Sequence, residues 1–164
     1  MNEQTRKLIL DWMRKIHILE YANRSESIRW KNIHFWLGVP ALVLGVLIAA
    51  VPKLDFFADA VSTVLTLGGL LIAILTGLQT FLKSSEKSES FRKMSVRYEE
   101  LRHKIEVLLQ TDTEKEAQAG LEKIRKEWAA IDSINVSQNH FNRAKGKVKK
   151  FGKYPEELSF LENI

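Results

Sequence analysis

The stretches Ile33–Val51, IHFWLGVPALVLGVLIAAV, and Val61–Leu82, VSTVLTLGGLLIAILTGLQTFL, decide the fold of this chain. Neither contains Asp, Glu, Lys or Arg, and such a charge at the centre of a bilayer costs about 2.5–3.5 kcal/mol. As α-helices the two stretches would be roughly 28 and 33 Å long, close to the roughly 30 Å thickness of a hydrocarbon layer. We therefore predict two transmembrane helices, at residues 33–51 and 61–82, joined by a short outer loop at residues 52–60.

The charges that flank the two stretches predict their orientation. Basic residues gather before the first stretch and after the second: Arg14, Lys15, Arg24, Arg29, Lys31, Lys83, Lys87, Arg92, Lys93, Arg97 and Arg102. The connecting loop holds only Lys53, beside Asp55 and Asp59. Because basic flanks stay on the cytoplasmic side, both termini are expected in the cytoplasm. The lipid bilayer of the cell membrane is then the expected binding partner of the two spans. The first stretch starts after a long amphipathic segment, so no cleaved signal peptide is predicted.

Small and hydroxyl-bearing residues form one stripe along each predicted span. On the first span the stripe is Gly38, Ala41, Gly45 and Ala49, and on the second it is Ser62, Thr66, Gly69, Ala73, Thr76, Gly77 and Thr80. In one interpretation the stripes pack the two helices of a single hairpin together, since small residues let helices approach closely in lipid. In the other, several hairpins assemble and the hydroxyl stripe faces a central path. Such a path would select weakly among ions, because the spans carry no ring of charges.

The segments on either side predict further helices. Residues 1–32 form an amphipathic cytoplasmic helix in which Leu8, Trp12, Ile16 and Leu19 share a face. It either continues unbroken into the first span or lies on the lipid surface. Residues 83–136 show a heptad seam in two runs, with a capping box at Thr113 and Glu116 between them. The seam consists of Phe91, Met94, Tyr98, Leu101, Ile105, Leu108, Leu121, Ile124, Trp128 and Ile131.

These patterns predict an all-α membrane protein: a two-helix transmembrane hairpin with an N-terminal amphipathic helix and a cytoplasmic antiparallel helical hairpin. The seam serves either the interior of that second hairpin or contacts between the subunits of a homo-oligomer. From residue 137 onward the periodicity fades, and Gly146 and Gly152 are expected to interrupt any helix. This basic C-terminal tail, residues 137–164, contains Arg143, Lys145, Lys147, Lys149, Lys150 and Lys153.

Three interpretations of the basic tail stay open. It is a solvated tail, a contact with anionic lipid worth about 1 kcal/mol per basic residue, or a contact with phosphates of nucleotides or nucleic acid. Specific nucleic-acid binding is not expected.

Catalytic chemistry is not indicated anywhere in the chain. The sequence has no cysteine, and its four histidines, His17, His34, His103 and His140, lie far apart. It contains no HExxH pair, Walker loop or GxSxG elbow. We therefore expect no enzyme activity, no catalytic or metal-binding residues and no cofactor.

The run LTGLQTFLKSSEKSESFRKMSVRYEELRHKIEVLL, from Leu75 to Leu109, resembles the SLATT family of bacterial two-helix membrane proteins, which associate with SMODS nucleotidyltransferases and SLOG domains. The lead-in YANRSESIRWKNIH, Tyr21–His34, and Trp128 are similar to the family as well. The resemblance covers about residues 15–135. It implies a role in antiviral defence by abortive infection, as an inner-membrane effector controlled by a nucleotide second messenger or a co-encoded defence protein.

Three functional hypotheses follow. The first is an oligomeric effector that forms a pore or depolarises the membrane. The second is a non-conducting anchor or scaffold for a signalling partner such as a nucleotidyltransferase. The third, a holin-like hairpin, fits poorly because about half of the chain follows the second span.

Overall fold

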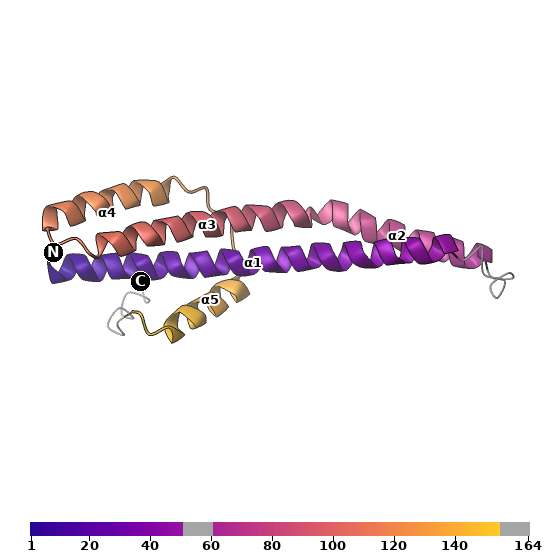
Figure 1. Cartoon of the computed structure of the whole chain (residues 1–164), viewed down its shortest axis with the longest axis horizontal. Helices are drawn as coiled ribbons and strands as arrows, with labels where there is room; N and C mark the ends of the chain where they lie inside the picture. The colour runs from indigo at the N-terminus through magenta and orange to yellow at the C-terminus, as the bar shows by residue number, and fades with distance from the viewer. Residues whose placement is uncertain (51–60, 155–164) are drawn as a thin grey trace. The chain divides into compact units, whose positions relative to one another are not determined.

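The computed structural model describes residues 1–50 and 61–154, and these residues form five α-helices and no strand (Figure 1). The helices are α1 (Glu3–Ala50), α2 (Val61–Leu82), α3 (Ser84–Leu108), α4 (Glu114–Ala129) and α5 (Gln138–Lys150). The prediction of an all-helical chain with two long apolar helices is confirmed. The predicted outer loop, residues 52–60, lies outside the described residues.

The chain divides into two compact units whose boundaries fall inside helices. One unit contains residues 1–27 and 90–164, and the other contains residues 28–89. α1 contributes to both, because its 48 residues form one helix that continues through Pro40. Proline removes one backbone hydrogen bond from a helix, and the turns on both sides of it continue. Of the two arrangements predicted for the N-terminal segment, the structure has the unbroken helix.

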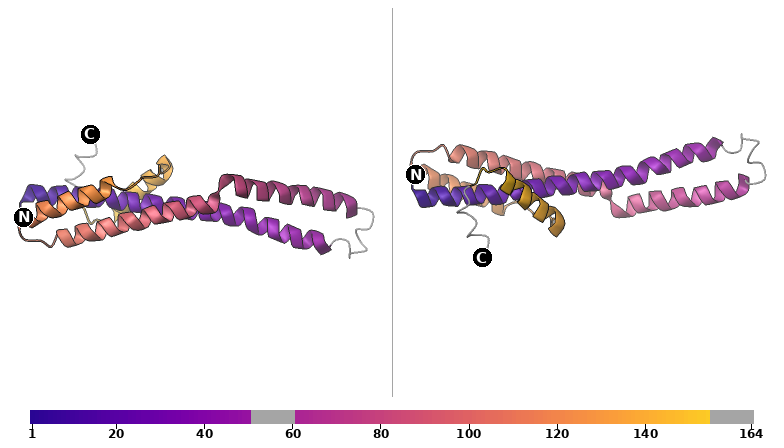
Figure 2. Two further views of the ribbon diagram at one scale, coloured as in Figure 1. Left: turned by 90° about the horizontal axis from the view of Figure 1, so that it is seen from above. Right: turned by 90° about the horizontal axis from the view of Figure 1, so that it is seen from below.

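The first unit is built around the N-terminal part of α1. α3 runs antiparallel to α1, and α4 returns alongside both, so that their apolar faces enclose one core (Figure 2). The fully or nearly fully buried members of this core are Ile9, Met13, Ile16, Met94, Tyr98, Leu101, Ile105, Leu108, Ala117, Leu121 and Ile124. A second cluster, in which Ile18 and Ala22 contact Ala144 and Val148 of α5, forms on the opposite face of α1.

The buried face of α1 differs by one position from the predicted stripe. Leu8, which was placed on the apolar face, is 44% exposed, whereas Ile9 and Met13 are buried. Trp12 and Leu19 are partly buried at the edge of the core. Because α1 is covered on two sides, its buried residues do not follow a single stripe.

The start of α4 agrees with the predicted position, although the capping box does not form as expected. Thr113 is the N-cap residue, but its side chain caps no backbone N–H. Instead its hydroxyl donates to the Glu116 carboxylate at 2.7 Å. The N-terminal end of α1 closes the first turn of α4, since the Thr5 hydroxyl and the Asn2 backbone N–H both donate to Glu114.

The C-terminal segment corrects the predicted tail. Gly146 does not interrupt a helix there, because it lies inside α5. Ala144 and Val148 are buried one turn apart against α1, and this apolar contact supports the helix. Gly152 follows α5 with a φ of 61°, a left-handed conformation that glycine adopts readily.

Candidate functional site

The second unit is a pair of antiparallel apolar helices formed by residues 28–50 of α1 and by α2. A side chain added at Gly38 would meet the amide of Gln79, one at Gly45 would meet Ile72, and one at Gly68 would meet Ile48. From Gly38 through Gly45 to Ile48 on α1, the contacted positions on α2 decrease from Gln79 through Ile72 to Gly68. This opposite order is what antiparallel packing requires. Gly38, Gly45 and Gly68 therefore lie at the contact between the two helices.

The predicted stripe of the first span faces α2. Gly38 and Gly45 lie against α2, and Ala41 is buried. Ala49, at the end of α1, is exposed. Gly38 and Gly45 thus contact the second helix, whereas Ala49 does not take part in a buried contact.

The predicted stripe of the second span lies elsewhere. Gly69 and Gly77 have no atom within 4 Å of an added Cβ, and Ala73 is exposed. Gly68, which the sequence analysis did not place in the stripe, is the glycine that meets α1. The small-residue stripe of α2 therefore points away from α1.

The threonine hydroxyls on this outward stripe are bonded to their own helix. Thr66 donates to the carbonyl of Ser62 at 2.8 Å, Thr76 to that of Ile72 at 2.8 Å, and Thr80 to that of Thr76 at 2.9 Å. A threonine bonded in this way exposes its methyl group and keeps acceptor capacity on its oxygen. The stripe is thus compatible with an apolar environment.

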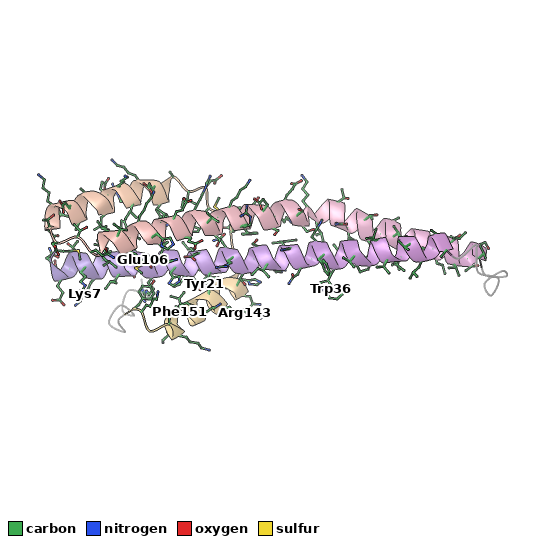
Figure 3. All side chains as sticks on the ribbon, in the orientation of Figure 1. Lys7, Tyr21, Trp36, Glu106, Arg143 and Phe151 are labelled. Carbon is green, nitrogen blue, oxygen red and sulfur yellow. The ribbon has the colours of Figure 1, made fainter. Side chains whose placement is uncertain are left out.

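Large apolar side chains cover the remaining outer surface of the pair. No residue of α2 is buried. Trp36 and Leu42 on α1 are both 70% exposed, and Phe81 on α2 is 85% exposed (Trp36 is labelled in Figure 3). A soluble monomer rarely exposes a continuous apolar surface of this extent.

A polar cluster closes one end of the pair. The Gln79 amide nitrogen lies 3.0 Å from Nδ1 of His34, and the Ser84 hydroxyl lies 3.4 Å from the same nitrogen. Ser84 is 1% exposed. α2 ends at Leu82, and Lys83, which has a φ of 47°, separates it from α3. Sequence analysis did not predict the pairing of His34 with Gln79, which only the antiparallel register determines.

Cations surround Trp30 near the same end. Lys87 Nζ lies 4.3 Å from the centre of the Trp30 ring, and the Arg29 guanidinium carbon lies 5.6 Å from it. Tryptophan with flanking basic residues is typical of a membrane–water interface.

The predicted heptad seam is buried within the first unit. All six of its members on α3 are at most 8% exposed, and Leu121 and Ile124 of α4 are buried against them. Trp128 and Ile131 are partly buried at the edge. The heptad spacing corresponds to contacts between α1, α3 and α4 of one chain, so an assembly that used these residues would have to open this core.

The six basic residues of the C-terminal segment do not share a single environment. Lys147 lies 4.7 Å above the ring of Tyr21, which stands on α1. Arg143, Lys145, Lys149, Lys150 and Lys153 are exposed, on or just after α5 (Tyr21 and Arg143 are labelled in Figure 3). They belong to a packed helix and its C-terminal end, not to a free tail over residues 138–150.

Hydrogen bonds and a ring contact attach the C-terminal segment to α1. His17 Nδ1 and the Tyr154 hydroxyl share a hydrogen bond of 2.9 Å, and Phe151 stacks on the His17 ring. The backbone N–H of Ser137 donates to Glu26 at 3.0 Å. Burial, and then the positive charges of Arg102 and Lys153, lower the pKa of His17 to about 4. The imidazole is therefore neutral at pH 7.

Arg102 forms ion pairs with two carboxylates of the first unit. Its guanidinium donates to Glu20 at 2.7 Å and to Glu106 at 2.6 Å. Burial alone would lower the pKa of Arg102, but these carboxylates raise it on balance. Burial likewise favours a higher pKa for Glu106, but His103 and Arg102 hold it below its ordinary value. Within the described residues, no group of three or more His, Cys, Asp or Glu could hold a metal ion.

These features define an all-helical protein in which a compact helical unit and a pair of exposed apolar helices share one long helix. No family model, curated protein or solved structure matches the chain.

Proposed function

We propose that this chain is a homo-oligomeric effector of the bacterial inner membrane that depolarises the membrane on an infection signal. The apolar pair would cross the bilayer, with both termini in the cytoplasm. Its outer surface supports the membrane part of the proposal, because lipid would cover the apolar side chains and each helix satisfies its own backbone hydrogen bonds.

The exposed stripe of small residues on α2 is the observation that supports the proposed homo-oligomer. Gly69, Ala73 and Gly77 stand four residues apart on a face that α1 leaves open. In lipid no hydrophobic drive holds helices together, so small residues at this spacing are where helices pack most closely. A second copy of α2 is the partner we propose for this face.

Thr66, Thr76 and Thr80 border the same face and would line or adjoin a path between copies. Neither span contains Asp, Glu, Lys or Arg, so such a path would conduct ions with little selectivity. The role in abortive infection rests on the resemblance to the SLATT family alone. A non-conducting anchor for a signalling protein is the second candidate, and the same experiments decide between them.

The first experiment measures membrane potential by dye fluorescence in bacteria that express the chain. We expect the wild type to depolarise the cells and the triple variant Gly69→Leu, Ala73→Leu, Gly77→Leu to leave the potential unchanged at equal membrane abundance. A matched control is Thr63→Leu, an exposed position of α2 outside the stripe, which should depolarise the cells like the wild type. If the wild type never depolarises the cells, the anchor is favoured.

The second experiment tests the interface directly and uses the absence of native cysteine. Ala73→Cys should form a disulfide between chains in oxidised membranes. Ile72→Cys, one residue away but facing Gly45 of α1, should not. Equal cross-linking at both positions, or none at Ala73, would refute assembly through this face.

A further inference from the structure

The junction between α2 and α3 is broken at a single residue, Lys83. Its φ of 47° is left-handed, and no other non-glycine residue has a positive φ in the part of the chain that the structure describes. A residue with a side chain adopts this conformation at a cost, and helices that end in this way usually use glycine. The surrounding run FLKSSEKS, residues 81–88, contains neither glycine nor proline. The local sequence therefore does not encode the break, and tertiary contacts must hold it.

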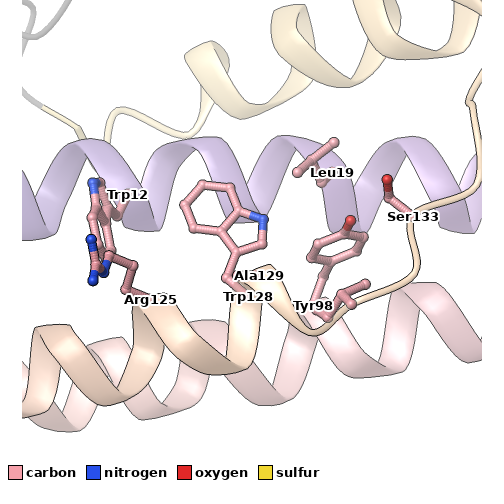
Figure 4. A pocket seen from close by; sticks show the side chains of 8 residues that line it. Trp12, Leu19, Tyr98, Arg125, Trp128, Ala129 and Ser133 are labelled. Carbon is pink, nitrogen blue, oxygen red and sulfur yellow. The ribbon is translucent and has the colours of Figure 1, made fainter.

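The buried face of α3 provides the reference for the effect of this break. It repeats every seven residues, and its members at that spacing are at most 6% exposed: Ser84, Phe91, Tyr98 and Ile105. Figure 4 shows Tyr98 pointing from α3 toward α1, beside Leu19. The face of α3 that begins at Ser84 is thus the face directed at α1.

The exposed stripe of α2 is in phase with that buried face. On an uninterrupted helix, at about 100° per residue, Ala73 and Gly77 would lie within about 20° of Ser84. Ser84 is 1% exposed, but Ala73 and Gly77 are exposed. The break at Lys83 therefore turns α2 so that its stripe faces away from α1, whereas one continuous helix would turn the stripe toward α1.

A hydrogen bond that requires the break holds it in place. Gln79 Nε2 lies 3.0 Å from Nδ1 of His34, and the Ser84 hydroxyl lies 3.4 Å from the same nitrogen. On an uninterrupted helix Gln79 and Ser84 would stand about 140° apart. Both side chains reach His34 only because α2 is turned at Lys83.

The alternative packing also suits an apolar environment. α1 presents Gly38 and Gly45 to α2, and a turned α2 would set Ala73 and Gly77 against them, so that the helices would meet through small residues on both sides. Ile72 would turn outward, at little cost where the surroundings are as apolar as the side chain. A helix with two faces that can pack and one strained junction is a two-state element.

We propose that Lys83 is the hinge of a conformational switch that exposes or covers the stripe of α2. When Lys83 is left-handed, Gln79 bonds to His34 and the stripe is open. When Lys83 is helical, α2 and α3 form one helix, that hydrogen bond is lost, and the stripe packs on α1. The consequence for assembly rests on the function proposed above, because only the broken form offers the stripe to a second copy.

Paired cysteines in the full chain, in the membranes of expressing bacteria, report the two forms, since the chain has no cysteine of its own. Gly45→Cys with Ile72→Cys should cross-link in the broken form, because a side chain at Gly45 meets Ile72. Gly45→Cys with Ala73→Cys should cross-link in the continuous form, in which Ala73 is turned toward α1. The measurement is the ratio of these two cross-links within one chain, made with a short bifunctional thiol reagent.

Two substitutions of Lys83 should move this ratio in opposite directions, although both remove the same charge and the same contact to Glu86. Lys83→Gly relieves the left-handed conformation and should favour the broken form, whereas Lys83→Ala should favour the continuous helix. The ratios of the two variants should differ by on the order of tenfold. Gln79→Leu, which loses the bond to His34, should act like Lys83→Ala.

The switch is overturned if the ratio is the same in all three variants, or if glycine and alanine at position 83 move it in the same direction. Assembly is measured separately, by the disulfide between chains at Ala73→Cys alone, which should increase with Lys83→Gly and decrease with Lys83→Ala. If that disulfide is equal in both variants, the switch does not control assembly. If it never forms while the ratio responds as expected, the switch holds and the proposed assembly is refuted.

Discussion

Arg102 on α3 donates from Nε to the Glu20 carboxylate on α1 at 2.7 Å, and their side chains are only 13% and 5% exposed. Glu20 also accepts a hydrogen bond at its backbone carbonyl from Ser95, so this one residue of α1 is joined twice to α3. A charge pair at this depth is sensitive to the loss of either partner, because the remaining charge stays buried without compensation.

Replacing Arg102 should therefore destabilise the first unit strongly. We expect Arg102→Leu to cost about 3–5 kcal/mol, measured by thermal unfolding in mild detergent. The control is Lys126→Ala, which removes an exposed contact to Glu122 and should cost at most about 1 kcal/mol. Equal effects of the two substitutions would show that the buried pair is not formed.

Two glycines within helices should respond in opposite directions to alanine. A Cβ at Gly120 would collide with Cδ1 of Leu108 and lie 3.3 Å from its Cγ, and Leu108 is itself buried, so Gly120→Ala should destabilise by about 1–3 kcal/mol. A Cβ at Gly146 meets nothing, so Gly146→Ala should stabilise α5 by about 0.5–1 kcal/mol through helix propensity. Destabilisation by Gly146→Ala would contradict the helix over Gln138–Lys150.

The neutral state of His17 gives stability a defined pH dependence. Because the pKa falls from 6.5 to about 4 on folding, the unfolded chain binds more protons between these values. Stability should therefore decrease as the pH is lowered through this window and be insensitive to His17 above it.

The measurement is the unfolding temperature from pH 4 to pH 7 for the wild type and His17→Gln. Arg102, Lys153 and Glu106 act on the imidazole and stay present in both proteins. We expect a shallower decrease in the variant, and parallel curves would exclude a buried neutral histidine.

Membrane orientation can be read from single cysteines, since the chain contains none. In intact cells a membrane-impermeant maleimide should label Asp55→Cys, in the predicted outer loop, and should leave Lys149→Cys on α5 unlabelled. Lys149→Cys should become labelled once the cells are opened. The reverse pattern would place both termini outside and contradict the orientation inferred from the basic flanks.

Sequence alone determined the features that depend on local composition and on periodicity along one helix. The uncharged run Val61–Leu82 coincides with α2, because a change from apolar to charged residues marks its end. The heptad positions from Phe91 to Leu108 are all buried, because a helix with one apolar stripe has one face to bury. The start of α4 after Thr113 follows from local preference in the same way.

The tertiary structure decided which neighbour each face meets, which periodicity along one helix does not specify. α1 is buried on two opposite sides, so Ile9 replaces Leu8 in the core and Glu20 is buried because Arg102 reaches it. Gly146 lies in a helix because Ala144 and Val148 find apolar partners on α1, a gain that outweighs the poor helix propensity of glycine.

The register of the two apolar helices shows most clearly a feature that only the tertiary structure decided. Gly68 and Gly69 are neighbours of the same type, and nothing in their sequence separates them. Only the packing of α2 on α1 sets Gly68 against Ile48 and leaves Gly69 open. Composition therefore determined that the helices are apolar, whereas contacts between residues distant in sequence decided which face remains for a partner.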